Sequence, residues 1–147
     1  MPDDNELLLN RNQKRSVEIT LRRLEKLLGR IEREQDLPEE KGRLYRFYNS
    51  LQGEPEQARL LELAGEGRSQ LKELADLFHL QPISENRLDL YRGELNVLWE
   101  SLIEIESARL KGYGSVNPHL GALLDPPVRR LTQLVVQMET IASGYRI

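Results

Sequence analysis

Hydrophobic residues recur at helical spacing along almost the whole chain. Between residues 6 and 35 they lie four, three, four and three positions apart, the heptad spacing of helices that pack side by side at shallow angles. The residues of this seam are Val17, Leu21, Leu24, Leu28 and Ile31. The same periodicity, punctuated by proline and glycine, predicts further helices over 38–51, 55–78, 84–111 and 126–142, and a short helical turn over 117–124. No stretch alternates with period two, so no strand is predicted.

These elements predict an all-α fold: an antiparallel bundle of three to four long helices with short linking helices. We find no internal repeat and no shift in composition, which predicts a single domain over 1–147 with a flexible N-terminus over 1–5. Gly65 and Gly67 fall inside the predicted helix 55–78. Glycine weakens a helix interior by about 1 kcal/mol relative to alanine. The pair therefore marks either a break, which could be a hinge, or a site of close packing.

The predicted helix 84–111 is more apolar than a single seam requires. Its seam residues are Leu88, Tyr91, Leu95, Leu98, Leu102 and Ile105. Four other apolar residues lie off this seam: Leu90, Val97, Ile103 and Leu110. A helix that is apolar around much of its circumference is normally buried on several sides. We therefore expect this helix either to run through the centre of the bundle or to contact another chain, with these four residues as the candidate partner-binding set.

Composition excludes several classes of protein. The 147 residues include no cysteine, so there is no disulfide framework, cysteine-ligated zinc site or thiol nucleophile. No apolar run approaches the ~18 residues of a membrane-spanning helix, and the acidic start is unlike a secretory signal. The expectation is a soluble, cytoplasmic protein without a membrane span.

Candidate catalytic and metal-binding residues are few. Asp76 and His79 lie one helical turn apart, but a di-iron bundle needs two such acid–histidine motifs. Glu100 and Glu104 could present two carboxylates on one face for acid–base chemistry, but a solvated polar strip is the favoured interpretation. Residues 70–88 have part of the spacing of a helix-turn-helix, with His79 where glycine is usual in the turn. We predict no enzyme activity and no cofactor or metal; an enzyme that uses these residues is the third alternative.

Charge is unevenly distributed along the chain. Residues 11–33 contain eight basic and three acidic residues, whereas the net charge of the whole chain is −3. A basic face of this kind can bind phosphates, or it can pair with acidic groups of the same protein or of a partner. Its residues are Arg15, Arg22, Arg23, Lys26, Arg30 and Arg33. No aromatic residue is interleaved with them, so a platform for stacking bases is absent from this face.

Together these patterns predict a non-enzymatic protein–protein interaction or assembly module. The expected partner is a second copy of the chain or another protein, bound through apolar helix faces, which predicts a homo-oligomer in the first case. The alternative function is nucleic-acid binding through the basic face of the first helix. The overall acidic charge makes nucleic acid the less expected partner.

Overall fold

The computed structural model describes residues 8–144, so the N-terminus over 1–5 that we expected to be flexible lies outside the described residues. The chain is 71% helical, and the described residues form five α-helices and one two-stranded sheet. The prediction of an all-α fold is confirmed, and the helix–helix contacts fit a helical bundle. The chain divides into two compact units, Met1–Pro82 and Ile83–Ile147, which are described separately below.

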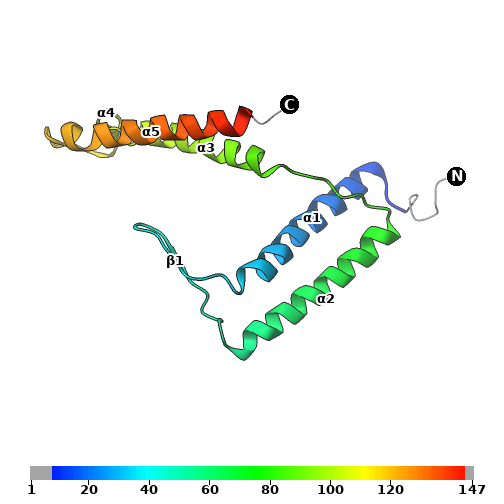
Figure 1. Cartoon of the computed structure of the whole chain (residues 1–147). Helices are drawn as coiled ribbons and strands as arrows, with labels where there is room; N and C mark the ends of the chain where they lie inside the picture. The colour runs from blue at the N-terminus through cyan, green and yellow to red at the C-terminus, as the bar shows by residue number, and fades with distance from the viewer. Residues whose placement is uncertain (1–7, 145–147) are drawn as a thin grey trace. The chain divides into compact units, whose positions relative to one another are not determined.

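The first unit is built on two helices, α1 (Arg11–Glu34) and α2 (Pro55–Leu77), which run side by side in opposite directions (Figure 1). The helix α1 begins at Arg11, later than the predicted start at Glu6, because Asn10 forms a capping box. Its side chain accepts a hydrogen bond of 2.8 Å from the Gln13 amide, and the Gln13 side chain accepts one of 3.0 Å from the Asn10 amide. Such a box satisfies two amides that the first helical turn leaves without partners.

The contact between α1 and α2 confirms most of the predicted seam. Its core consists of the buried residues Leu28, Ala64 and Leu71, with Leu21 and Ile31 packed against them. Helix α2 continues without a break through both glycines. A Cβ atom at Gly67 would lie 3.2 Å from Leu28 Cδ1, whereas one at Gly65 would meet no atom within 4 Å. Gly67 is therefore a site of close packing, and Leu24 of the predicted seam is left exposed.

The predicted helix over 38–51 is wrong. This segment, which connects α1 to α2, forms a β-hairpin with strands β1 (Glu40–Lys41) and β2 (Arg46–Phe47), and it projects away from the end of α1 in Figure 1. A Cβ atom at position 42 would lie 2.5 Å from the Tyr45 carbonyl oxygen, so the tight turn requires Gly42. The Tyr45 and Phe47 rings contact edge to face at 4.8 Å. Aromatic residues favour strands. In this segment their strand preference prevails over the helical spacing of the apolar residues, which is coincidental.

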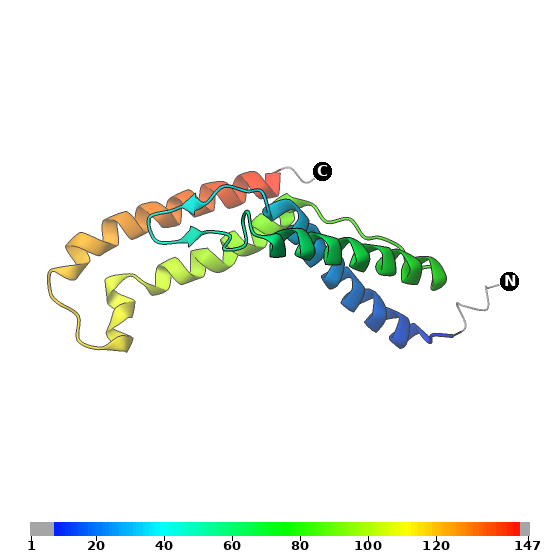
Figure 2. The same cartoon turned by 90° about the horizontal axis from the view of Figure 1, so that it is seen from below.

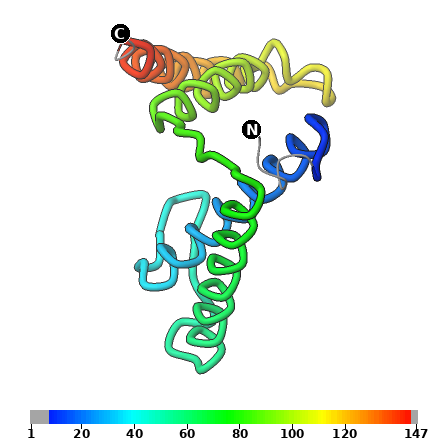
Figure 3. The backbone as a smooth tube through the Cα atoms, turned by 90° about the vertical axis from the view of Figure 1, so that its right-hand side faces the viewer, coloured from blue at the N-terminus to red at the C-terminus, as the bar shows by residue number. Residues whose placement is uncertain are grey.

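A residue with left-handed backbone geometry, His79, follows the end of helix α2. Beyond the C-cap Phe78, His79 has φ +53°, and the Leu80 amide donates to the Ala75 carbonyl at 2.9 Å. Residues 80–86 then have no regular secondary structure, and Figure 3 shows an extended stretch there. The next helix begins at Arg87 rather than Ser84, so the tight turn of a helix-turn-helix is not formed.

The second unit is a helical hairpin of α3 (Arg87–Glu104) and α5 (Leu120–Gly144), antiparallel in Figure 2. Between them lie α4 (Ser107–Leu110) and the 3₁₀ turn η2 (Lys111–Tyr113). The prediction of one continuous helix over 84–111 is therefore wrong. The predicted turn over 117–124 and helix over 126–142 are instead joined in α5, which contains Pro126 and Pro127.

The break between α3 and α4 is stabilised by Asp125 of α5. Its carboxylate accepts hydrogen bonds from the Ser107 hydroxyl at 2.6 Å and from the Ser107 amide at 2.8 Å. It therefore caps α4, although Asp125 itself lies within α5. These hydrogen bonds from Ser107 hold the pKa of the Asp125 carboxyl below its ordinary value, and the Arg129 charge acts in the same direction.

We expect this cap to make the stability of the second unit depend on acid pH. Because the pKa of Asp125 is lowered in the folded state, its stabilisation is present above the ordinary carboxyl pKa near 4 and is lost as the pH falls through the lower folded value. Asp125→Asn removes this dependence. Thermal unfolding followed by circular dichroism from pH 7 to pH 2 measures it, with the exposed Asp76→Asn as control. Identical acid profiles for wild type and Asp125→Asn would contradict the prediction.

Candidate interaction surfaces

The α3–α5 hairpin covers little of its own apolar surface. Its buried hydrophobic residues are Val128, Val135 and Ala142, all on α5. Within the described part of the chain, α3 has no buried residue. Three seam residues spaced seven apart on α3, Leu88, Leu95 and Leu102, are only partly buried. The predicted seam of this helix is therefore divided between residues partly covered within the unit and residues left open to solvent.

The open part of the seam forms a groove between the two helices. It has a volume of about 350 Å³ and is lined mainly by apolar side chains: Leu88, Tyr91, Leu95, Leu98, Met138, Ile141 and Ala142, with Glu94 also at the groove. We call this surface the α3–α5 groove. Tyr91 and Leu98 are 53% and 51% exposed, and Met138 and Ile141 are also exposed. Large contiguous apolar patches are uncommon on monomeric proteins and mark surfaces that bind something.

The four residues predicted to bind a partner do not share one face. Leu90 and Val97 are seven positions apart on α3 and are 50% and 63% exposed. Ile103 is half-buried, and a helix of 3.6 residues per turn places it on the other side of the seam. Leu110 is half-buried on α4, beyond the end of α3. Sequence reasoning placed all four on one continuous helix, whereas the break at Ile105 separates Leu110 from the other three, which lie on α3.

The basic face of α1 is partly paired within the first unit. Arg22 donates to Glu18 at 2.7 Å and to the Gln81 carbonyl at 2.9 Å. Arg30 lies 3.6 Å from the carboxylate of Glu34. Lys26 also has an interaction partner. The remaining basic-face residues, Arg15, Arg23 and Arg33, are exposed.

The residues weighed for catalysis or metal binding are not gathered into a site. Asp76 is exposed near the end of α2 with His79 just beyond it, whereas Glu100 and Glu104 are exposed on α3. Among residues 8–144, no group of three or more histidine, aspartate or glutamate side chains is arranged to hold a metal ion. In the same range, no helix is both long and apolar enough to span a membrane.

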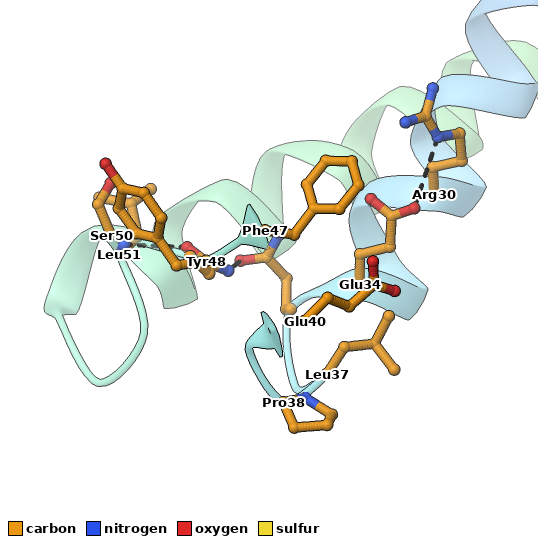
Figure 4. A pocket seen from close by; sticks show the side chains of 11 residues that line it. Arg30, Glu34, Leu37, Pro38, Glu40, Phe47, Tyr48, Ser50 and Leu51 are labelled. Carbon is orange, nitrogen blue, oxygen red and sulfur yellow. Dashed lines mark hydrogen bonds and ion pairs between the residues drawn. The ribbon is translucent and has the colours of Figure 1, made fainter. Parts of the chain in front are cut away.

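The β-hairpin carries exposed aromatic residues in the segment that was predicted to be a helix. Leu44 is 98% exposed and Tyr48 is 77% exposed, and Tyr45 and Phe47 are exposed as well. A pocket of about 380 Å³ lies beside the hairpin, lined in part by Phe47 and Tyr48 (Figure 4). The run of aromatic and basic residues over 41–48 is visible in the sequence and could have indicated this surface.

Comparisons with known proteins give no match. The chain fits no protein-family model, and neither the curated proteins nor the solved structures include one that is significantly similar to it.

Proposed function

We propose that the protein is a non-enzymatic helical assembly module that self-associates through the α3–α5 groove. The observation that carries this proposal is the open apolar groove on a two-helix unit in which α3 buries none of its residues. The groove supplies aromatic, methionine and leucine side chains, and interfaces are enriched in aromatic residues and methionine. The partner in this proposal is a second copy of the chain, which makes the protein a homo-oligomer.

A second copy fits the geometry of the groove. Two antiparallel helices that expose a shared apolar face resemble half of a four-helix bundle. A twofold axis would place the same face of a second hairpin on the first, so each copy buries the groove of the other. Leu88, Leu95 and Ile141 would then lie inside a four-helix core, while Glu94 would lie at its polar rim.

Size-exclusion chromatography with light scattering tests the proposal directly. We expect a multiple of 17.1 kDa that is the same at low and high salt, because burial of apolar surface is not screened by ions. A monomer at 17.1 kDa under both conditions, over the concentration range accessible to scattering, would contradict self-association.

Nucleic-acid binding through the basic face of α1 is the alternative proposal. It is supported by the exposed residues Arg15, Arg23 and Arg33, and it is weakened by the pairing of Arg22 and Arg30. The same chromatography separates the two functions when absorbance is recorded at 260 and 280 nm. Bound nucleic acid absorbs at 260 nm and is released at high salt, because phosphate contacts weaken steeply with salt.

A further inference from the structure

The two faces of the β-hairpin differ in charge. The register pairs Glu40 with Phe47 and Lys41 with Arg46. Residues directly opposite each other in an antiparallel pair share one side of the sheet, and residues two apart along a strand do so too. Lys41, Arg46 and Tyr48 therefore lie on one side, together with Glu39, and we call this side the basic hairpin face. Glu40, Tyr45 and Phe47 lie on the other side. In Figure 4, the Phe47 and Tyr48 side chains point in different directions, as this alternation requires.

The basic hairpin face carries an unfavourable charge pair. Like charges directly opposite each other destabilise a hairpin, and Lys41 is opposite Arg46. The Glu39 carboxylate lies 4.0 Å from Lys41 Nζ, and both side chains are exposed. An exposed pair of this kind contributes little to stability. Arg43 in the turn adds a third positive charge, and residues 41–48 contain no acidic residue. An anionic partner on this face would relieve the repulsion.

Aromatic rings accompany these charges. On this face, Tyr48 is among the most exposed large hydrophobic side chains of the described residues, whereas the exposed Tyr45 ring contacts Phe47 on the opposite face. Proteins that bind single-stranded nucleic acid combine positive charges along the backbone with aromatic side chains on which bases stack. This combination was missing from α1 alone, and the hairpin supplies it within eight residues.

We propose that the basic hairpin face binds single-stranded nucleic acid. Lys41 and Arg46 contact phosphates, and Tyr48 stacks on a base, with Arg43 in the turn extending the site. Single strands are favoured over a duplex because a duplex hides the faces of its bases from an aromatic ring. They are favoured over an anionic membrane because a lipid surface supplies negative charge but no base on which the exposed Tyr48 ring can stack.

Fluorescence anisotropy with the full-length protein tests this proposal. The probes are a labelled oligothymidylate and a labelled oligouridylate, with a duplex of equal length and phosphatidylserine vesicles as competitors. We expect binding to both single strands at low salt and weaker competition by the duplex and the vesicles. No binding to either single strand at low salt, or stronger competition by the duplex or the vesicles, would overturn the proposal.

Variants of exposed residues locate the site. Lys41→Ala with Arg46→Ala should lower the magnitude of the slope of log affinity against log salt by about 1.4, since each phosphate contact with a single strand contributes about 0.7. Tyr48→Ala should weaken binding about 5- to 150-fold, the range of one stacked base, and Tyr48→Phe should restore it.

The matched control removes the same charge from α1. Arg15→Ala with Arg23→Ala should leave both affinity and salt slope close to those of the wild type. Binding lost in this control but kept in the hairpin variants would place the site on α1 and overturn the proposal. Circular dichroism checks that each variant keeps its helices.

Discussion

Replacing Tyr91 and Leu98 together by glutamate is expected to convert the self-associated protein into a monomer. Both side chains line the α3–α5 groove and are about half exposed in the single chain. In the proposed assembly they become buried, so each substitution removes apolar burial and places a carboxylate in an apolar interface. Loss of a buried leucine side chain alone costs about 1.5–3 kcal/mol, and burying an unpaired charge adds to this. We expect at least a 100-fold weaker association, measured by light scattering or sedimentation equilibrium.

Leu90→Glu with Val97→Glu is the matched control for this experiment. The two residues lie on the same helix, are 50% and 63% exposed, and add the same charge, but they do not line the groove. Since they are exposed already, neither pair of substitutions disturbs the small core of the unit. An assembly that survives Tyr91→Glu with Leu98→Glu but dissociates with the control pair would place the interface on the face of Leu90 and Val97. An assembly that survives both would exclude α3 as the interface.

The sequence predicted the packing of α1 and α2 well because that contact depends on local periodicity. The heptad spacing identified Leu21, Leu28 and Ile31, which lie at the contact. The same spacing could not show that Leu24 stays exposed. A helix that packs against a single neighbour covers only part of an apolar stripe, and the stripe alone does not show which part. The same limit applies to α3, where Leu95 is partly buried and Leu98 is open to solvent.

Two errors in the sequence prediction arose from contacts that periodicity does not contain. The spacing of Leu44, Phe47 and Leu51 fits a helix, but the close approach of Gly42 to the Tyr45 carbonyl fixes a turn. The break after α3 depends on Asp125, which reaches Ser107 from eighteen residues further along the chain. The groove became visible only once the hairpin geometry showed which apolar residues remain uncovered.

Valine substitutions at Gly65 and Gly67 are expected to have different effects although they lie two residues apart on α2. At Gly67 even a Cβ atom would approach Leu28 Cδ1 to 3.2 Å, and the branches of valine need more space than that atom. Overpacking of this kind typically costs about 1–3 kcal/mol. At Gly65 no atom lies within 4 Å, and valine is a better helix former than glycine, so the free energy of unfolding should stay equal or rise slightly.

Thermal and urea unfolding of the full chain, followed by circular dichroism, measure this difference. For a domain of 60–100 residues, each kcal/mol shifts the midpoint by about 4–8 °C, so Gly67→Val should lower the transition of the first unit clearly below that of Gly65→Val. Leu28→Ala in the Gly67→Val background should recover part of the loss, since it removes the side chain that valine overlaps. Equal effects at both positions would mean that α2 does not pack closely on Leu28, and Gly67 would then have to be interpreted as a flexible point of the helix.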